Sequence, residues 1–307
     1  YLFTGFLEAG KTTIIQESLS DSSFNCGERW LVVLCEEGEV ELDLTKMAHG
    51  ADKVTVVTFD EEQLLTADRL SAAQKRAKAE RVIIEYNGMW NCKNMTLPWY
   101  WKVEQQITTI DGSTFPMYYT NMKSLLAEMI RKSEMIIFNR CDGIKDLNVY
   151  KRNIKAVNPS ADVIFEDSNG EIDEIFEEDL PYDLNQDPIV LDNQGYGIWY
   201  LDSMDHLERY VGKNIQFLAM VLKPEEYPDG YFVPGRMAMT CCAEDMAFLG
   251  YACEYAGTKD LKQKEWVKVT AKVAREYFAD YKGEGPVLHA ISVEKAKAPK
   301  DPVISFN

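Results

Sequence analysis

The sequence predicts an α/β domain with a mostly parallel sheet over residues 1–186, followed by a small all-β domain over residues 187–307. In the first part, short apolar runs alternate with helix-like segments, a pattern typical of a parallel sheet covered by helices on both faces. A stretch rich in Pro, Asp, Asn, Gln and Gly at residues 180–197 indicates a linker. Beyond it, strand-like runs are separated by turn-like clusters, which favours a small closed β-barrel.

The expected strands of the first domain are apolar runs of strand length. They lie at residues 1–4, 29–35, 54–59, 81–84, 107–110, 135–138 and 161–165. Helix patterns occupy the intervals at residues 13–19, 61–80, 121–132 and 147–156. Because ligands bind beyond the carboxyl ends of the strands in such sheets, we expect the functional residues in the loops that follow them.

The loop after the first expected strand reads GFLEAGKT and matches the phosphate-binding pattern GxxxxGK[ST]. Its backbone N–H groups would wrap a polyphosphate, Lys11 would neutralise β/γ-phosphate charge, and the Thr12 hydroxyl would ligate Mg²⁺. The expected cradle consists of Gly5, Glu8, Ala9, Gly10, Lys11, Thr12 and Thr13. The alternative is a chance match in a glycine-containing turn. With a strand before it and a helix after it, the loop indicates a P-loop NTPase domain.

A tetrapeptide after the apolar run 135–138 favours guanine over adenine. It reads Asn139-Arg140-Cys141-Asp142, at the place where GTPases carry Asn-Lys-x-Asp. The Asp142 carboxylate would accept hydrogen bonds from the guanine N1–H and exocyclic amine, which adenine does not supply. Asn139 would brace the base and the phosphate loop, and the Arg140 stem would cover the base plane. A surface turn at a strand end is the alternative.

Acidic residues follow two other expected strands. Glu85 ends the buried run 81–84, a placement that suits Mg²⁺ or water, and the N–H of Gly88 would touch the γ-phosphate. Residues 35–43 read CEEGEVELD. This segment is either a solvated turn or a switch loop that reaches Mg²⁺ through Asp43.

Together, GFLEAGKTT, CEEGEVELD, IIEYNG and NRCD resemble the motifs of the CobW-type GTPases, the metallochaperone-associated branch of the P-loop GTPases. The resemblance covers roughly residues 1–180. It implies that Lys11 and Thr12 hold phosphate and Mg²⁺, and that Asp142 reads guanine. It also implies that Glu36, Asp43 and Glu85 surround the metal ion and the attacking water. Lys11, Glu36 and Glu85 are thereby the expected catalytic residues.

The chain departs from the CobW-type pattern at three places. Cys35 stands where the family has Asn, and Arg140 stands where it has Lys. The CxCC metal-binding motif is missing, because no cysteine lies between Asp43 and Glu85. The resemblance therefore implies GTP binding but not metal transfer through a thiolate cluster of this domain.

The second domain is expected to have strands at residues 214–222, 231–242, 266–273 and 287–293, with one helix at 203–211. Its segments GKNIQFLAMV and EWVKVTAKV resemble strands of an OB-fold. The domain is also similar to an uncharacterised bacterial domain, with a TCC-x-x-D core, found in partners of predicted permeases. Cys241 and Cys242 are a speculative Zn²⁺ pair, to which Glu244, Asp245 or His289 could add ligands. Since adjacent strand residues point to opposite faces, apolar packing is the alternative.

Composition narrows the function. The formal net charge is −17, and residues 1–186 contribute −13 of it, with 19 basic and 32 acidic residues. This charge argues against nucleic acid as the main partner and indicates a solvated surface or an acidic docking face. Seven cysteines, several in strand-like runs, favour reduced thiols and a cytoplasmic location. There is no apolar run of the roughly 20 residues that span a membrane, and we expect natural residues before Tyr1.

These patterns predict a cytoplasmic GTP-binding protein with Mg²⁺-dependent hydrolysis, acting as a nucleotide switch linked to metal homeostasis or to a protein client. Zn²⁺ is a possible second cofactor. One alternative is a low-turnover, nucleotide-sensing adaptor that docks on a membrane transporter. Another is an oligonucleotide-binding module, which the acidic charge of the second domain disfavours.

Overall fold

The computed structural model describes residues 1–145, 147–172, 180–239 and 246–305. The chain forms two compact units. One comprises residues 1–147 and 160–175, and the other comprises residues 148–159 and 176–307. Each unit has its own hydrophobic core, and the two are described separately below.

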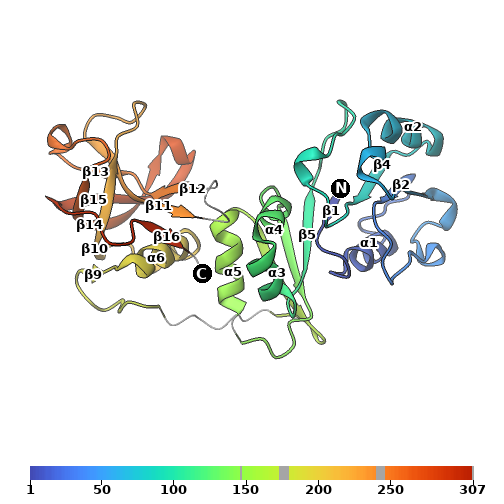
Figure 1. Ribbon diagram of the computed structural model, residues 1–307, viewed down its shortest axis with the longest axis horizontal. Coiled ribbons are helices and arrows are strands. Elements are labelled where there is room, and N and C mark those ends of the chain that lie inside the picture. The colour runs from blue at the N-terminus through green and yellow to red at the C-terminus, as the bar shows by residue number, and fades with distance from the viewer. Residues whose placement is uncertain (146, 173–179, 240–245, 306–307) are drawn as a thin grey trace. The chain divides into compact units, whose positions relative to one another are not determined.

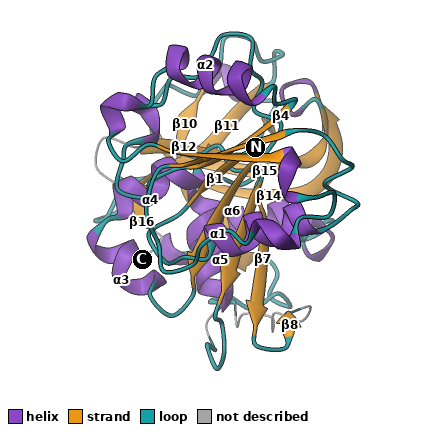
Figure 2. Ribbon diagram, turned by 90° about the vertical axis from the view of Figure 1, so that its right-hand side faces the viewer, coloured by secondary structure: helices purple, strands orange, loops and turns teal. Residues whose placement is uncertain are grey.

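An eight-stranded sheet organises the first unit, in the order β3-β2-β4-β1-β5-β6-β7-β8. Figure 1 labels β1, β2, β4 and β5 of this sheet. Its strands are β1 (Leu2–Thr4), β2 (Trp30–Leu34), β3 (Val54–Thr58), β4 (Arg81–Glu85), β5 (Gln106–Asp111), β6 (Met135–Asn139), β7 (Asp162–Asp167) and β8 (Gly170–Glu171). The neighbours pair in parallel except for β7 and β8, which form a short antiparallel hairpin visible at the end of β7 in Figure 2. The predicted mostly parallel sheet is confirmed.

Both faces of this sheet are buried, because successive side chains of a strand point to opposite sides. On β2, Leu31 and Val33 pack in one cluster with Leu70 of helix α2 (Ala67–Ala77). Val32 packs in another with Ile15 of helix α1 (Lys11–Ser20). The other helices of the first unit are α3 (Phe115–Asn121) and α4 (Lys123–Ile130). Helix α5 (Leu147–Val157) belongs, from residue 148 on, to the second unit. A parallel sheet covered on both faces leaves its carboxyl edge for ligands.

Helix α2 is shorter than the predicted 61–80. The Thr66 hydroxyl accepts the backbone N–H of Arg69 and caps the first turn. The helix ends where Lys78 adopts a left-handed backbone with φ 52°. Residues 62–64 before it form a separate 3₁₀ turn. Cap chemistry, rather than the apolar pattern, sets both ends.

The second unit is built on an antiparallel-rich sheet in the order β12-β11-β13-β15-β14-β10-β9, with an additional pairing between β10 and β11. Its strands are β9 (Ile189–Val190), β10 (Asn214–Leu222), β11 (Tyr231–Met239), β12 (Met246–Gly250), β13 (Cys253–Glu254), β14 (Trp266–Phe278), β15 (Gly283–Lys295) and β16 (Val303–Ser305). The pairings therefore run from β10 through β11, β13, β15 and β14 back to β10. The predicted all-β character is confirmed, while the OB-like assignment stays a prediction.

The helix predicted at residues 203–211 is wrong, and so is a linker extending to residue 197. Helix α6 runs from Asn193 to Asp205 instead. The Asp192 carboxylate accepts the N–H of Gly195 at 2.7 Å and caps its first turn. Tyr196 and Trp199 are then buried in the core of the unit. Two glycines and a polar first turn hid this helix from an apolar pattern, and tertiary burial of its aromatic residues stabilises it.

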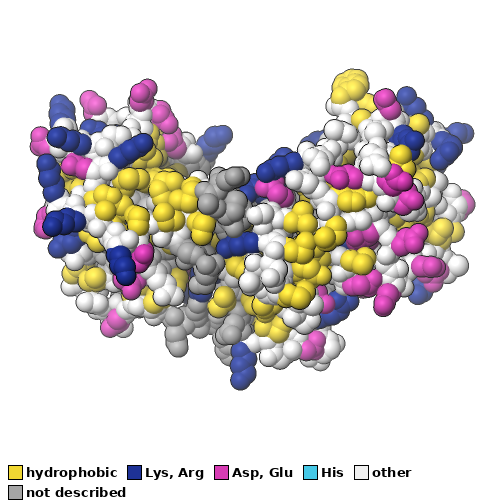
Figure 3. Space-filling view, viewed as in Figure 1, with side chains coloured by type: hydrophobic (Ala, Val, Ile, Leu, Met, Phe, Trp, Pro, Cys, Tyr) yellow, Lys and Arg dark blue, Asp and Glu magenta, His cyan; other side chains and the backbone are white. Residues whose placement is uncertain are grey.

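Further structural facts bear on the sequence predictions. In the described part of the chain, no helix combines the length and the apolar character needed to cross a membrane. Cys241 and Cys242 lie outside the described residues, so the speculative zinc pair is untested. Many Asp and Glu side chains lie on the visible face of the first unit, the right-hand part of Figure 3.

A histidine between two carboxylates gives the second unit a pH-dependent stability. His289 contacts Glu254 through Nδ1 and Glu276 through Nε2, both at 2.8 Å. Burial alone would lower the pKa of His289, but the two carboxylates outweigh it and raise that pKa above 6.5. The protonated form therefore stabilises the fold at pH below 6.5, and this stabilisation is lost as pH rises through the raised pKa.

We expect wild type to melt at a higher temperature than His289→Gln at pH 6, and the difference to shrink toward zero at pH 9. Thermal unfolding followed by circular dichroism at both pH values measures it. A melting difference that is the same at the two pH values would contradict this role of His289.

Candidate nucleotide site

The phosphate loop connects β1 to α1 and is closed in by neighbouring strands. Gly5 has φ +139°, and a Cβ there would lie 2.3 Å from the carbonyl oxygen of Thr109 on β5. Gly10 has φ +91°, and a Cβ there would lie 2.6 Å from Nδ2 of Asn139. Both positions combine a left-handed backbone with a close neighbour, so they require glycine.

Lys11 is folded back into this loop. Its side chain is 2% exposed, and its Nζ donates to the carbonyl oxygens of Gly5 and Phe6, each at 2.9 Å. It also forms an ion pair with the buried carboxylate of Glu36. The cavity at this point measures only about 30 Å³. A triphosphate would need Lys11 and Glu36 to separate, since together they occupy the cradle.

Thr12 and Glu85 form the second pair of the site. The Thr12 hydroxyl lies 2.9 and 3.1 Å from the two carboxylate oxygens of Glu85. Burial raises the pKa of Glu85, against the opposing effects of Lys11 and Thr12. A hydroxyl and a carboxylate at this position are hard oxygen ligands of the kind that Mg²⁺ prefers. Thr12 and Glu85 are the residues that could hold that ion.

Gly88 brings the loop after β4 against the phosphate loop. Its N–H donates to Oε2 of Glu36 at 3.3 Å. A Cβ at Gly88 would lie 2.4 Å from the carbonyl oxygen of Gly5 and 2.6 Å from Cα of Phe6. Glu36 therefore joins Lys11 to the loop after β4.

The Asn-Arg-Cys-Asp tetrapeptide after β6 braces the phosphate loop. Asn139 Nδ2 donates to the carbonyl oxygen of Ala9 at 2.8 Å. Arg140 Nη1 donates to the carbonyl oxygen of Glu8 at 2.8 Å and to Oδ2 of Asp111 at 2.6 Å. The structure thus brings Asn139 and Arg140 to the predicted loop, with Arg140 anchored by an acid that the sequence analysis missed.

Asp111 could have been found from the sequence. It is the last residue of β5, and its carboxylate lies at the same edge of the sheet as Glu85 on β4. Burial would raise the pKa of Asp111, but hydrogen bonds from Ser113 and Arg140 lower it overall. An acid directly after the apolar run 107–110 was the available signal.

The Asp142 side chain contacts the turn after β7 rather than the phosphate loop. It is exposed, and its Oδ1 accepts the N–H of Ser168, after β7, at 3.1 Å. Hydrogen bonds from the side chain and the backbone of Ser168 lower the pKa of Asp142. Asp142 and the turn after β7 thus lie together beside the braced loop.

Asp43 is not brought to the other acids in this conformation. Its carboxylate accepts the N–H of Thr45 at 3.0 Å and caps the 3₁₀ turn Leu44–Lys46. The side chain and the backbone of Thr45 together lower the pKa of Asp43. Its own N–H donates to Oε1 of Gln16 on α1 at 2.7 Å. Within the described part of the chain, no hydrogen bond joins the Asp43 carboxylate to Thr12. The remaining predicted residue, Thr13, lines the small cavity.

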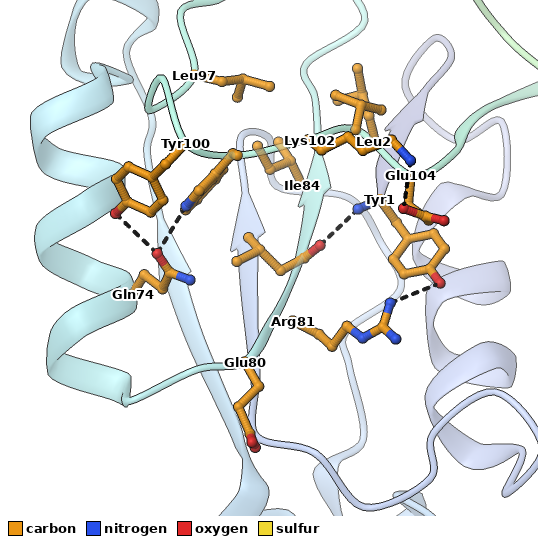
Figure 4. Close-up of a pocket in the computed structure, with 13 residues that line it drawn as sticks. Tyr1, Leu2, Gln74, Glu80, Arg81, Ile84, Leu97, Tyr100, Lys102 and Glu104 are labelled. Atoms are coloured by element: carbon orange, nitrogen blue, oxygen red, sulfur yellow. Dashed lines mark hydrogen bonds and ion pairs between the residues drawn. The ribbon is translucent and has the colours of Figure 1, made fainter.

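A larger cavity lies elsewhere on the first unit. It measures about 320 Å³ and is situated at Tyr1, the amino end of β1 (Figure 4). On one side Gln74 accepts hydrogen bonds from Trp101 at 2.8 Å and Tyr100 at 3.2 Å. Because ligands of parallel sheets bind at the carboxyl ends of the strands, this cavity is not the nucleotide site.

Among residues 1–145, 147–172, 180–239 and 246–305, no three His, Cys, Asp or Glu side chains converge so that they could hold a metal ion. Cys35 is buried, and burial raises the pKa of its thiol to about 12. It packs in the core cluster with Leu31, Val33 and Leu70.

The parallel sheet, the braced phosphate loop and the Thr12–Glu85 pair define a P-loop nucleotide-binding domain. The chain belongs to the CobW/HypB/UreG family, whose nucleotide-binding domain model matches residues 1–165. A second family model, the DUF1980 C-terminal domain, matches residues 168–305. The predicted two-part resemblance is confirmed by these two matches.

Individual proteins are similar to this chain at low sequence identity. The UPF0703 protein YcgQ of Bacillus subtilis is 24% identical over 109 residues, and the match spans 34% of this chain and 38% of YcgQ. The hydrogenase maturation factor HypB from Archaeoglobus fulgidus is 13% identical, with 55% of this chain and 81% of HypB covered and a TM-score of 0.38. Zn(II)-bound YjiA GTPase from E. coli is 16% identical, with 81% and 87% covered and a TM-score of 0.38.

The close approach at Gly88 gives a stability prediction. We expect Gly88→Ala to destabilise the first unit by about 1–3 kcal/mol, because the added Cβ must push the backbone of Gly5 and Phe6 apart. Gly283→Ala is the matched control, since its Cβ would meet only the carbonyl oxygen of Tyr281, at 3.9 Å. Denaturant unfolding measures both variants, and equal losses would show that the contact at Gly88 is not tight.

Proposed function

We propose that the first unit binds GTP together with Mg²⁺ and hydrolyses it as a nucleotide switch. The proposal depends on one observation: side chains from two groups of neighbouring residues contact the phosphate loop and fix its backbone. Lys11, Thr12 and Glu85 converge within it, while Asn139 and Arg140 hold its backbone from the base side. The residues present fit the ligand, because Gly5 and Gly10 allow the tight backbone of the loop and the hard oxygen ligands of Thr12 and Glu85 lie beside it.

In the proposed complex, the loop's N–H groups and Lys11 bind the phosphates. The ammonium of Lys11 exchanges the carbonyl oxygens of Gly5 and Phe6 and the Glu36 carboxylate for phosphate oxygens. Thr12 and Glu85 would hold Mg²⁺, which neutralises charge on the phosphates when bound. Glu36, released from Lys11, remains next to the N–H of Gly88 and orients the attacking water.

Base selection is assigned to Asp142. Its depressed pKa keeps the carboxylate ionised, as two hydrogen bonds from guanine require. The hydrogen bond from Ser168 fixes one oxygen and leaves the group exposed toward solvent. Arg140 is held by Glu8 and Asp111, so its role is to link the base side of the site to the phosphate loop.

Family membership supports a link to metal homeostasis or to a protein client. Zn²⁺ binding by Cys241 and Cys242 stays part of this proposal, as does a cytoplasmic site of action. The alternative is an adaptor that senses nucleotide with little turnover and docks on a membrane transporter. The burial of Lys11 against Glu36 favours slow nucleotide entry, which is consistent with low turnover in such an adaptor.

Hydrolysis is tested at Lys11. We expect steady-state GTP turnover with Mg²⁺ in wild type, and a loss of about a hundredfold or more in Lys11→Ala, because the loss of a preorganised charge raises the barrier. Lys46→Ala, a change at a largely exposed lysine, is the control. Tight GTP binding without turnover that depends on Lys11 would contradict the enzyme and support the adaptor.

Specificity is tested at Asp142. We expect Asp142→Asn to weaken GTP binding about 10- to 100-fold, because charged hydrogen bonds are lost, while ATP binding stays the same. Asp162→Asn, an exposed acid at the amino end of β7, is the matched control. Competition with a fluorescent nucleotide measures both. An equal loss for GTP and ATP would contradict guanine reading by Asp142.

A further inference from the structure

Glu8 occupies an unusual backbone position in the phosphate loop. Its φ is +60°, in the left-handed region that disfavours residues with a Cβ. The backbone is held there from outside, because the Glu8 carbonyl oxygen accepts Arg140 Nη1 at 2.8 Å. An acidic side chain is therefore fixed at the mouth of a site proposed for phosphate.

The Glu8 carboxylate contacts the acidic segment after β2, residues 36–43. Its Oε1 accepts the backbone N–H of Glu39 at 2.8 Å. A Cβ at Gly38 would lie 3.1 Å from the same oxygen, so the segment lies directly on the Glu8 side chain. The same segment carries Glu36, which is paired with Lys11. Glu8 thus holds the segment that keeps the Lys11 ammonium occupied.

The charges around Lys11 are unbalanced. Glu8, Glu36 and Glu85 line the small cavity together with the single ammonium of Lys11 and the guanidinium of Arg140. Arg140 is engaged by Asp111. A triphosphate entering this cavity adds several negative charges next to the Glu8 carboxylate. At an effective dielectric constant of about 20, like charges this close change a binding constant by about tenfold or more.

We propose that Glu8 regulates the nucleotide site by competing with phosphate. Its carboxylate repels the incoming phosphates and holds residues 38–39, so phosphate entry expels the Glu8 side chain and frees residues 38–43, while Glu36 stays at the N–H of Gly88. Nucleotide affinity and the position of this segment are thereby linked through one side chain. The inference rests on the nucleotide binding proposed above and adds its regulation.

The charge is tested with Glu8→Gln, which keeps the shape of the side chain and an oxygen that can accept from Glu39. We expect the Kd of a fluorescent GDP or GTP analogue with Mg²⁺ to fall about tenfold, and its dissociation to slow, because the repulsion is removed. Glu41→Gln is the control. It removes one charge from the same segment at an exposed residue that does not line the cavity, and it should leave the Kd unchanged.

The contact is tested with Glu8→Ala, which removes the acceptor of the Glu39 N–H. Without nucleotide, we expect hydrogen exchange over residues 36–41 to be faster in Glu8→Ala than in wild type and Glu8→Gln. An unchanged Kd in Glu8→Gln, or exchange in Glu8→Ala equal to wild type, overturns the inference while nucleotide binding by wild type stands. If wild type binds no nucleotide, the proposed function itself fails, and the inference fails with it.

Discussion

The nucleotide site depends on the burial of one ammonium group. Lys11 is almost completely removed from solvent, and a charge in that position needs partners on every side. Two carbonyl oxygens of the loop and the Glu36 carboxylate supply them. The loop's tight path, the glycines that allow it and the braces from Asn139 and Arg140 all hold these partners in place. In our account, phosphate binding exchanges one set of anionic partners of Lys11 for another.

The first unit was predictable from sequence because its signals are local. Alternating apolar runs place the strands, and the loop GFLEAGKT between a strand and a helix marks the carboxyl edge of the sheet. Asn139 was expected to brace the phosphate loop, and it does contact Ala9. The structure keeps these features because a parallel sheet of alternating strands and helices leaves them few alternatives.

Features set by tertiary contacts escaped prediction. Asp43 serves its own 3₁₀ turn and a glutamine of α1, which no spacing rule reveals. Asp111 binds Arg140 across two strands, and helix α6 forms on a segment whose Pro, Asn and Gly content resembles a linker. Contacts distant in the sequence contribute in each case: Gln16 for Asp43, Arg140 for Asp111 and the core of the second unit for α6. The strain at Glu8 belongs to the same class, because only its φ and its contact with Glu39 make it conspicuous.

The most direct test is a crystal structure of the full chain with a non-hydrolysable GTP analogue and Mg²⁺. The account predicts that Lys11 contacts β- and γ-phosphate oxygens, that Glu36 has left Lys11, and that guanine lies against Asp142. A structure in which the Lys11–Glu36 pair persists while nucleotide binds elsewhere would contradict the central claim.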